Sequence, residues 1–340
     1  ANQGNNGGGG ASVVSGGNAT AVSALTGGGG GSGVNGGGST SVDGGEDDGG
    51  GGGGGDGIAD LVLQDITERL LGRGFDLSAI QGACASEGVG PYQNVFLQEC
   101  AMLNHLIATM IGSLEELSKG IKGELIMSEA MEKLSSSLSV GNLPQVWRDV
   151  SYPTKRQLSS WVTDLIKRIT QMETWANRPT TIPVVTWISG LSNPQSFLTA
   201  VMQTSAHENA YELDRLSIFT EVTKKMDPLD FPTTAKDGVY IYGLTLEGAR
   251  WALGSSNLEP SMPREPSCVM PVMNVRAVMV TPLLTKASGG SSTSNTEYEC
   301  PVYATRERGS THVFDAKLRT RAAVAKWILA GVALILDMGN

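Results

Sequence analysis

The first 57 residues contain no lysine, no arginine and no aromatic side chain. They hold 26 of the 45 glycines, and their five acidic residues carry −5 of the net charge of −9. Such a segment cannot bury enough apolar surface to offset the loss of chain entropy. We therefore predict a disordered, glycine-rich linker or insertion over residues 1–57. A phosphate-binding loop is poorly supported, because GxxxxGK[ST] needs a lysine and none follows a glycine run.

Basic faces and long apolar runs are also scarce. The 283 residues after position 57 carry only −4, which is −9 minus −5, so the sequence predicts neither a nucleic-acid partner nor a charged contact with a membrane. The longest apolar run, 328–336, is interrupted by Gly331 and is shorter than the roughly 20 residues that span a bilayer. Residues 1–30 do not resemble a signal peptide. Because the chain begins with Ala1, we expect a fragment or a processed product.

Cysteine and histidine are too few and too scattered to indicate a metal site. The four cysteines form no CxxC pair, and such sparse cysteines are typical of a reducing compartment. The pair His207-Glu208 begins like a zinc-binding HExxH motif, but position 211 is tyrosine. The sequence therefore predicts no metal ligands among these residues, which are Cys84, Cys100, Cys268, Cys300, His105, His207 and His312.

Motifs for other chemistry are missing as well. Ser189 lacks the glycine two residues earlier that a GxSxG nucleophile turn requires. Asp227, Asp230 and Asp237 do not follow the spacing of a calcium-binding EF-hand loop. Glu115-Glu116 is typical of a solvated helix face. From the residues alone we predict no catalytic, cofactor-binding or metal-binding residue, and a non-enzymatic α+β module.

Apolar residues at helical spacing predict a series of helices in the first half of the ordered chain. The last of them has Asn193 as its N-cap and Pro194 at its first position. The predicted N-terminal helix has its apolar stripe on Ile58, Leu61, Val62, Ile66 and Leu70. The helices cover about residues 58–70, 92–119, 124–138, 154–176 and a segment that begins at 193.

After about residue 215 short β-like runs alternate with turn residues, which predicts an antiparallel sheet or barrel. The Ser/Gly/Thr stretch 287–296 is predicted to be a loop. The candidate strands are Ser217–Thr223, Gly238–Tyr242, Leu244–Glu247, Cys268–Val272, Arg276–Thr281, Glu299–Ala304, His312–Ala316 and Trp327–Leu336.

Six tryptophans are spread over the whole ordered region. Each can bury a large apolar area, and a buried indole N–H usually has a partner. We expect most of them to anchor the core, although tryptophan is also enriched at interface hot spots. The six are Trp147, Trp161, Trp175, Trp187, Trp251 and Trp327.

Several sequence blocks together resemble one family, the C-terminal end of dynein heavy chains. They follow the family's order and spacing and extend over about residues 58–340. The blocks are Gln98-Glu99, Lys119–Gly123, Trp147–Ala176, Trp187–Gly190, Pro194–Thr199, Asp237–Leu244, Leu246–Trp251, Met270-Pro271, Cys300–Tyr303, Arg308–Ser310 and Trp327–Leu334.

Five positions depart from the family pattern and concern local packing or contacts. Leu191 and Ser192 stand where the family usually has aromatic residues, and Ser196 stands where glycine is usual. Thr245 and Ala330 replace a typical phenylalanine and arginine. The glycine-rich leader falls at a variable link of the family.

The resemblance implies a fold and two domains. Residues 58–150 are expected to be the helical end of the sixth, nucleotide-inert AAA+ module. Residues 151–340 are expected to form the C-terminal cap, with helices to about 215 followed by a mostly antiparallel, β-barrel-like half.

The resemblance also implies a function. The parent protein is expected to be an ATP-driven, minus-end-directed microtubule motor of the axoneme in cilia or flagella, and its ATP, Mg²⁺ and microtubule sites lie upstream. The partners implied are the rest of the motor ring and, through the parent, intermediate chains, light chains and microtubules. The alternative is a freestanding binding module derived from a dynein C-terminus. An ATPase in its own right is disfavoured, because no Walker lysine exists.

Overall fold

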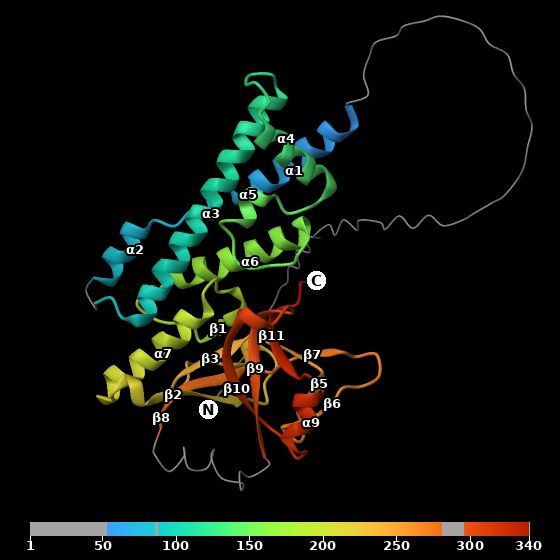
Figure 1. The fold of residues 1–340 in the computed structure, drawn as a ribbon. Coiled ribbons are helices and arrows are strands. Elements are labelled where there is room, and N and C mark those ends of the chain that lie inside the picture. Colours follow the sequence, from blue (N-terminus) through green and yellow to red (C-terminus); the bar gives the residue numbers. More distant parts are fainter. Residues whose placement is uncertain (1–52, 86–87, 281–295, 340) are drawn as a thin grey trace, which may run out of the picture. The chain divides into compact units, whose positions relative to one another are not determined.

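The structure is a computed structural model and describes residues 53–85, 88–280 and 296–339 (Figure 1). The predicted linker at 1–57 lies outside the described residues apart from positions 53–57, which belong to the first helix. The α-helices are α1 (Gly53–Leu70), α2 (Leu77–Cys84), α3 (Pro91–Ile121), α4 (Glu129–Val140), α5 (Gln145–Arg148), α6 (Leu158–Ala176), α7 (Pro194–Asn209) and α9 (Val324–Leu329). Short 3-10 helices are η1 (Ile188–Gly190), η2 (Leu213–Arg215), η3 (Pro228–Asp230) and η4 (Gly309–Thr311).

The long helix α3 is the centre of the helical region, and α1, α4, α6 and α7 pack against it (Figure 1). It begins at Pro91 in the first helical position, where the missing N–H of proline leaves no bond unmade. Its apolar stripe is buried along its whole length, as the sequence predicted for 92–119. The predicted cap of α7 is also confirmed, since the Asn193 side chain accepts the Ser196 N–H at 3.1 Å.

Helix ends deviate from prediction where polar caps or extended segments intervene. The helix α4 begins at Glu129 instead of 124, because Ser128 provides its N-cap. The helix α6 begins at Leu158 instead of 154, and Thr154 and Arg156 of the preceding segment bind Asp337. The prediction that Leu61 belongs to the buried stripe of α1 is wrong, since it is 70% exposed. The short helices α2 and α5 were not predicted.

The strands of the described residues form three sheets, which Figure 1 shows below the helices. One sheet has the order β1-β3-β8-β2, the second β10-β9-β11-β4-β7, and the third pairs β5 with β6. Of the eight pairings between described strands, six are antiparallel, and β1–β3 and β9–β11 are parallel. The bounds are β1 Val185–Trp187, β2 Leu216–Val222, β3 Val239–Tyr242, β4 Thr245–Glu247, β5 Ala249–Ala252, β6 Asn257–Pro260, β7 Ser267–Val269, β8 Met273–Met279, β9 Glu297–Thr305, β10 His312–Arg319 and β11 Ala333–Asp337.

The two larger sheets meet along the edge strands β2 and β10. The Thr220 hydroxyl of β2 accepts the backbone N–H of Lys317 of β10 at 2.7 Å, and Thr220 is only 3% exposed. A side chain thus takes the place of a backbone ladder between these two edges. The mixed α+β class and the mostly antiparallel pairing are confirmed. A closed barrel is not, because the described strands form sheets of open order.

Most candidate strands are confirmed within a few residues, but three deviations are informative. The predicted strand 327–336 is wrong in its first part, because Trp327 lies in α9 and the strand begins only at Ala333. Gly331 separates the two elements with a φ of +63°, a conformation that suits glycine. The strand β8 begins at Met273 instead of 276. The strands β1, β5 and β6 were not predicted, and the predicted loop 287–296 lies outside the described residues except for Thr296.

Among the described helices, α3 alone is long and apolar enough to cross a membrane by length and composition. Its best window has a mean hydropathy of 1.2, and 44% of that window is buried inside the protein. A core helix meets the same criteria, and α3 contributes Phe96, Leu103 and Leu106 to the core.

Candidate functional site at the junction of the helices and the sheets

The helix α3 sends one carboxylate into the loop before α7. Glu99 is 4% exposed, and its two oxygens accept the backbone N–H groups of Ser192 and Asn193 at 2.8 and 2.9 Å. Hydrogen bonds to a charged acceptor are stronger than neutral ones, especially when buried. Glu99 therefore fixes the start of α7 against α3. Since the bond uses the main chain of Ser192, the departure from the family at this side chain leaves the contact intact.

The helix α6 holds the end of β1 by a second side chain. The Gln171 amide accepts the backbone N–H of Trp187 at 2.8 Å and donates to its carbonyl at 3.2 Å. A glutamine that pairs with both backbone groups of one residue acts like an additional strand partner. The strand β1 is thus bound by β3 on one side and by a helix side chain on the other.

Two glycines make room for the indole ring of Trp187. A Cβ on Gly243 would lie 2.4 Å from Trp187 Cδ1, and a Cβ on Gly190 would lie 2.2 Å from Trp187 Cε3. Gly243 also has a φ of +95°, which other residues rarely adopt. The Ser189 hydroxyl donates to the carbonyl of Gly243. Two family blocks that are about 50 residues apart in sequence are therefore parts of one packing unit.

A buried ionic network lies between α6 and the end of β11. The Arg168 Nε donates to Asp164 at 2.7 Å, and both side chains are less than a tenth exposed. Arg156 binds Asp337 at 2.8 Å and lies 3.8 Å from Asp164. Asp337 also accepts the Thr154 hydroxyl at 2.9 Å. These bonds attach the last strand of the sheet region to the helical region.

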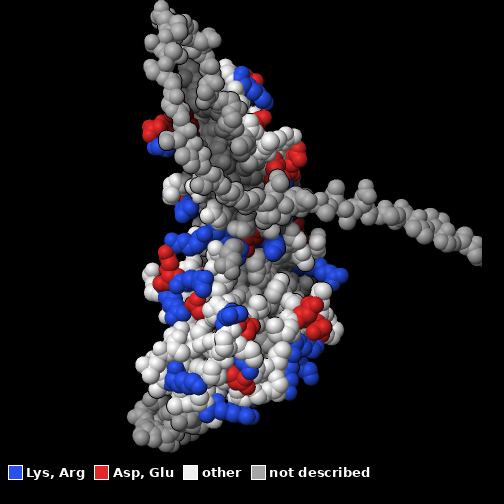
Figure 2. All heavy atoms as spheres, turned by 90° about the vertical axis from the view of Figure 1, so that its right-hand side faces the viewer, with Lys and Arg blue, Asp and Glu red and all other residues white. Residues whose placement is uncertain are grey.

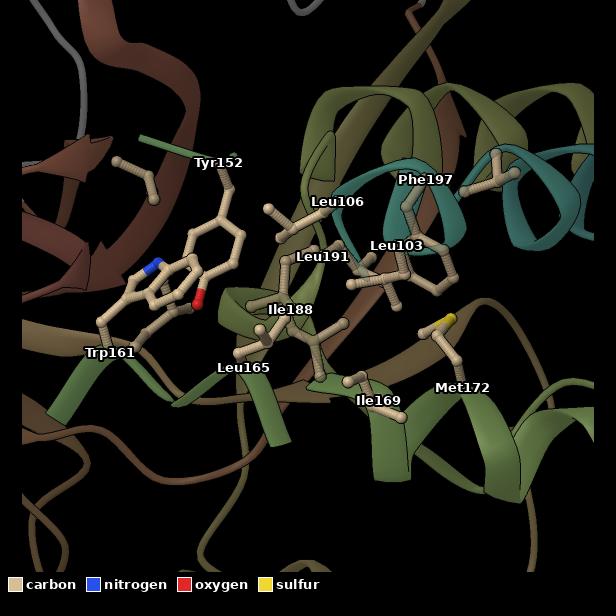
Figure 3. Close-up of a cluster of buried hydrophobic side chains, with 14 of the residues drawn as sticks. Leu103, Leu106, Tyr152, Trp161, Leu165, Ile169, Met172, Ile188, Leu191 and Phe197 are labelled. Carbon is tan, nitrogen blue, oxygen red and sulfur yellow. The ribbon is translucent and has the colours of Figure 1, made fainter. Parts of the chain in front are cut away.

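Aromatic rings flank this network, and Figure 3 shows Tyr152 and Trp161 side by side among leucine and isoleucine side chains. Their ring centres are 6.2 Å apart. The Arg168 guanidinium lies 3.6 Å from the centre of the Tyr152 ring, a cation–π contact inside the protein. Burial raises the pKa of the Tyr152 hydroxyl above its usual value, so the phenol stays neutral.

Most tryptophans anchor the core, as predicted. Trp147, Trp161, Trp175 and Trp327 are at most 1% exposed, and Trp251 is 9% exposed. The indole N–H groups of Trp147 and Trp327 donate to Ser113 and Thr320, respectively. None of the six indole rings is exposed. A role of tryptophan as an interface hot spot, which the sequence left open, therefore has no freely exposed ring to use.

The residues that were considered for catalysis do not converge. His105, His207 and His312 are exposed and come from different elements, and His312 contacts Asp315 at 3.1 Å. Glu115 and Glu116 are exposed on α3. The described residues include no group of three or more His, Cys, Asp or Glu that could hold a metal ion. The absence of a catalytic or metal site from the whole protein stays a prediction.

Three of the four cysteines are poor nucleophiles in this setting. Burial raises the pKa of the Cys100 thiol to about 12, and the nearby Glu99 carboxylate adds to the effect. Burial likewise raises the pKa of Cys300 and Cys268. Because the thiolate is the reactive form, these thiols are protonated and unreactive at neutral pH. The four cysteines are free, and Cys84 and Cys100 are fully buried.

A smaller cluster holds the loop after β9. Glu247 of β4 binds Arg306 at 2.7 Å and Arg308 at 2.9 Å, and Arg308 also donates to the Gly331 carbonyl. Burial alone would raise the pKa of Glu247, but the hydrogen bonds from the two arginines lower it overall. Arg308 belongs to one of the blocks that resemble the family, and it joins β4 to the turn before β11. Its φ of +58° is held by these contacts.

The sequence did not predict the ionic network, although one signal for it was present. Asp164 and Arg168 lie four residues apart within an apolar helical stripe, where a charged pair needs a buried partner. Their partners Arg156 and Asp337 are distant in sequence and could not be paired without the structure.

Figure 2 shows lysine and arginine interspersed with acidic side chains on one face of the molecule, without a large area of one charge sign.

Comparison with known proteins agrees with the family resemblance of the sequence. The family model for the C-terminal domain of dynein heavy chains matches residues 36–336. The chain is 41% identical over 281 residues to the dynein beta chain of the flagellar outer arm from Chlamydomonas reinhardtii, a match that covers 82% of this protein and 6% of the relative. It is 39% identical over 277 residues to dynein axonemal heavy chain 17 from Mus musculus and to the ciliary dynein beta chain from Heliocidaris crassispina, with the same two coverages.

The chain therefore spans about 6% of the length of these relatives. The match extends over most of the described helices and strands, and it includes every residue of the junction except Asp337. On these grounds the protein belongs to the family formed by the C-terminal domains of dynein heavy chains.

Proposed function

We propose that the protein is the C-terminal structural and regulatory region of an axonemal dynein heavy chain. The parent is an ATP-driven, minus-end-directed microtubule motor of cilia or flagella, and its cytoskeletal location is the axoneme. The proposal is supported by relatives that are named as flagellar outer-arm, axonemal and ciliary dynein chains. Within this motor the C-terminal region braces the ring and carries out no chemistry of its own.

We further infer that residues 58–150 end the sixth AAA+ module and that residues 151–340 form a cap across the ring. Contact between the edge strands β2 and β10 at Thr220 supports a barrel-like grouping of the two larger sheets. The cap therefore acts as one body attached to the helices of the last module.

The observation that carries the regulatory part is the buried junction. Glu99 links α3 to the start of α7, and Arg156 links the segment before α6 to Asp337 of β11. A rigid body in contact with several neighbours couples their states if it binds those states unequally. Such a junction transmits displacement, whereas a flexible connection would absorb it.

The proposal places ATP and Mg²⁺ in other parts of the parent. The sequence contains no GxxxxGK[ST] motif, and the described residues offer no cluster of metal-binding side chains. These observations are consistent with ATP chemistry in upstream modules of the parent, which remains part of the proposal. The proposed partners are the rest of the motor ring within the same polypeptide and, through the parent, intermediate chains, light chains and microtubules.

Deletion of residues 151–340 from the full-length motor tests this function. Velocity, force or ATPase rate should change while ATP binding upstream persists. Unchanged motility would contradict the regulatory role. Because α3 and α6 share a core, the deletion also uncovers apolar residues such as Leu103 and Leu106, so a gentler test is needed.

Two neighbouring residues provide that test with a matched control. Arg156 binds the buried Asp337, whereas Lys155 binds Glu307 in a pair whose side chains are 57% and 63% exposed. Exposed pairs contribute little. Arg156→Ala should alter the ATPase rate or velocity of the full motor, and Lys155→Ala should not. Equal behaviour of both variants would show that the junction does not transmit regulation.

The alternative is a freestanding, non-enzymatic binding module. It predicts a reading frame that lacks AAA+ modules with Walker motifs upstream of Ala1. Sequencing the transcript upstream of Ala1 separates the two proposals.

A further inference from the structure

The turn that joins β9 to β10, residues 306–311, carries an exposed serine. Ser310 is an exposed residue of the short helix η4, and a Cβ on the neighbouring Gly309 would meet nothing within 4 Å. The Thr311 hydroxyl donates to the Arg308 carbonyl at 3.2 Å, whereas the Ser310 hydroxyl has no hydrogen bond within the described part of the chain. Ser310 therefore offers a free hydroxyl to solvent at the end of a hairpin.

Two arginines of the same turn share one carboxylate. Arg306 and Arg308 stand four and two residues before Ser310, and they bind Glu247 of β4 at 2.7 and 2.9 Å. The side chains of the two arginines are 45% and 34% exposed, while that of Glu247 is 19% exposed. Two positive charges thus face one negative charge, which leaves the cluster with a net charge of +1.

The other acidic side chains close to the turn have partners of their own. Glu307 binds Lys155 at 2.7 Å, and Asp315 contacts His312 at 3.1 Å. Within the described residues, neither of these two carboxylates is paired with an arginine of the turn. The turn is therefore short of one negative charge beside a free serine hydroxyl.

A phosphate on Ser310 would supply that charge. A phosphoserine carries a charge of about −1.5 to −2 at pH 7 and three strong acceptor oxygens, and a guanidinium group binds phosphate through two parallel hydrogen bonds. The backbone N–H of Thr311 bonds to the Arg308 carbonyl at 3.3 Å, so the turn brings Ser310 back toward the arginines. Arg306 is the available partner, because it is the more exposed of the two and because Arg308 also donates to the Gly331 carbonyl.

The turn is also accessible to a kinase. Its backbone bonds from Arg308 to Thr305 and from Thr311 to Arg308 are 3.2 and 3.3 Å long, at or beyond the long end of the usual range. Exposed turns that are held by such bonds open locally at a small cost in free energy. Kinases select substrates by the charge pattern near the acceptor, and basophilic kinases select serines that follow arginines.

We propose that Ser310 is a phosphorylation site for a basophilic serine kinase and that the phosphate binds Arg306. The Ser310 oxygen attacks the γ-phosphorus of ATP, the bond from that phosphorus to ADP breaks, and the hydroxyl proton passes to the catalytic base of the kinase. The phosphate then competes with Glu247 for Arg306, while Arg308 stays with Glu247 and Gly331. The inference goes beyond the proposed function and does not depend on it.

Phosphorylation of the 340-residue protein tests the site. The protein is incubated with ATP and the catalytic domain of protein kinase C, a basophilic enzyme, and mass spectrometry of its peptides locates the phosphate. A synthetic peptide of residues 303–313 is treated in parallel. Ser310 should be modified in both. Phosphate on Thr311 instead, no phosphate on either substrate, or a modified peptide beside an unmodified protein would overturn the proposal.

A matched pair of variants tests the role of the arginine. Arg306→Gln removes the charge four residues before Ser310, whereas Arg319→Gln removes an exposed charge of β10 outside the turn. Arg306→Gln should slow the phosphorylation of Ser310 at least about tenfold, which corresponds to about 1.4 kcal/mol, and Arg319→Gln should not. Equal rates in the two variants would contradict recognition through the turn. Circular dichroism checks that both variants, at exposed positions, keep the fold.

The contact between the phosphate and Arg306 has a readout of its own. In ³¹P NMR the second pKa of the phosphoserine should lie below its usual value of about 6, because a nearby positive charge favours the dianion. In Arg306→Gln, phosphorylated by longer incubation, this pKa should return toward about 6. An equal pKa in both phosphorylated proteins would overturn the contact with Arg306.

Discussion

The helical and sheet regions of this molecule are held together in different ways. Around α3 the helices share a continuous core in which Trp147, Trp161 and Trp175 are almost fully buried. At its junction with the sheets, two charged side chains are buried and bonded: Glu99 to backbone N–H groups and Arg168 to Asp164. In the sheet region two sheets meet through the hydroxyl of Thr220, and many ion pairs are partly exposed.

The comparison indicates where a perturbation is transmitted and where it is absorbed. Removing one member of a buried ion pair lowers the free energy of unfolding by about 3–5 kcal/mol. Removing one member of an exposed pair changes it little. The helical region and its junction should therefore respond strongly to single substitutions. The sheet region should tolerate changes at its seam and surface. The four predictions below test this contrast, beginning with the largest effect.

Gly243→Val should have the largest effect, because it acts on both regions at once. Valine at a φ of +95° is strained, and its Cβ would lie 2.4 Å from Trp187 Cδ1. Backbone strain and overpacking together should lower the free energy of unfolding by about 4 kcal/mol. Urea unfolding monitored by tryptophan fluorescence measures it.

The matched control is Gly112→Ala in α3, where a Cβ would meet nothing within 4 Å. That variant should gain up to about 1 kcal/mol, because alanine favours helix over glycine. If Gly243→Val were as stable as the wild type, the packing of Trp187 between two glycines would not be a requirement of the fold.

Arg168→Met should have the next largest effect and tests the helical side of the junction. Methionine keeps much of the packing volume but leaves the buried Asp164 without its partner at 2.7 Å. The loss should be about 3 kcal/mol, since removing one member of a buried pair leaves an uncompensated charge. Arg156, 3.8 Å from Asp164, limits the loss.

The double variant Asp164→Asn/Arg168→Met serves as its control, because it removes both charges. It should be more stable than Arg168→Met alone. The outcome against this prediction is additivity: the double variant would lose as much free energy of unfolding as Asp164→Asn and Arg168→Met lose together. The two side chains would then act independently, and the network would be unimportant.

The helices could be predicted from sequence more closely than the strands, and the reason is physical. The apolar stripe of α3 repeats every three to four residues, so its signal is local. Strands need partners elsewhere in the sequence, and β1 owes its position to Gln171 and β3. The run that begins at Trp327 was ambiguous between helix and strand, since both bury a short apolar segment.

The junction could be predicted only in part. Glu99 and Gly243 belong to blocks that resemble the family, so their importance could be inferred from sequence, but not what they contact. Asp337 accepts a hydrogen bond from Thr154, which is 183 residues away. No local pattern encodes such a contact, because it depends on how the last strand folds back on the helices.

Thr220→Val tests the sheet seam and should have a smaller effect. Valine fits the strand and the volume of the site but cannot accept the N–H of Lys317. The loss should be about 1–1.5 kcal/mol, typical of one buried hydrogen bond. Ser217→Val, on the exposed face of the same strand, should stay within about 0.5 kcal/mol of the wild type. A seam variant that unfolds as readily as Arg168→Met would break the contrast between the regions.

Glu247→Gln should have the smallest effect, and its dependence on pH identifies the cause. The pKa of Glu247 in the folded protein is lowered below 4.5 by hydrogen bonds from Arg306 and Arg308, which outweigh the effect of burial. A lowered pKa stabilises the fold at neutral pH, and this contribution is lost as pH falls below 4.5 through the folded pKa. Because both arginines are more than a third exposed at their side chains, the effect at pH 7 should be at most about 1 kcal/mol.

Urea midpoints of the wild type and Glu247→Gln, measured from pH 7 to pH 3, give the answer. The gap between them should narrow as the pH falls below 4.5, since protonation neutralises the wild-type carboxyl. Glu307→Gln, at a pair that is 63% exposed on the glutamate side, should show little gap at any pH. If the difference in urea midpoint stayed constant with pH, the role of Glu247 would be packing and not charge. The sheet surface would then depend on packing as the helical core does, against the proposed contrast.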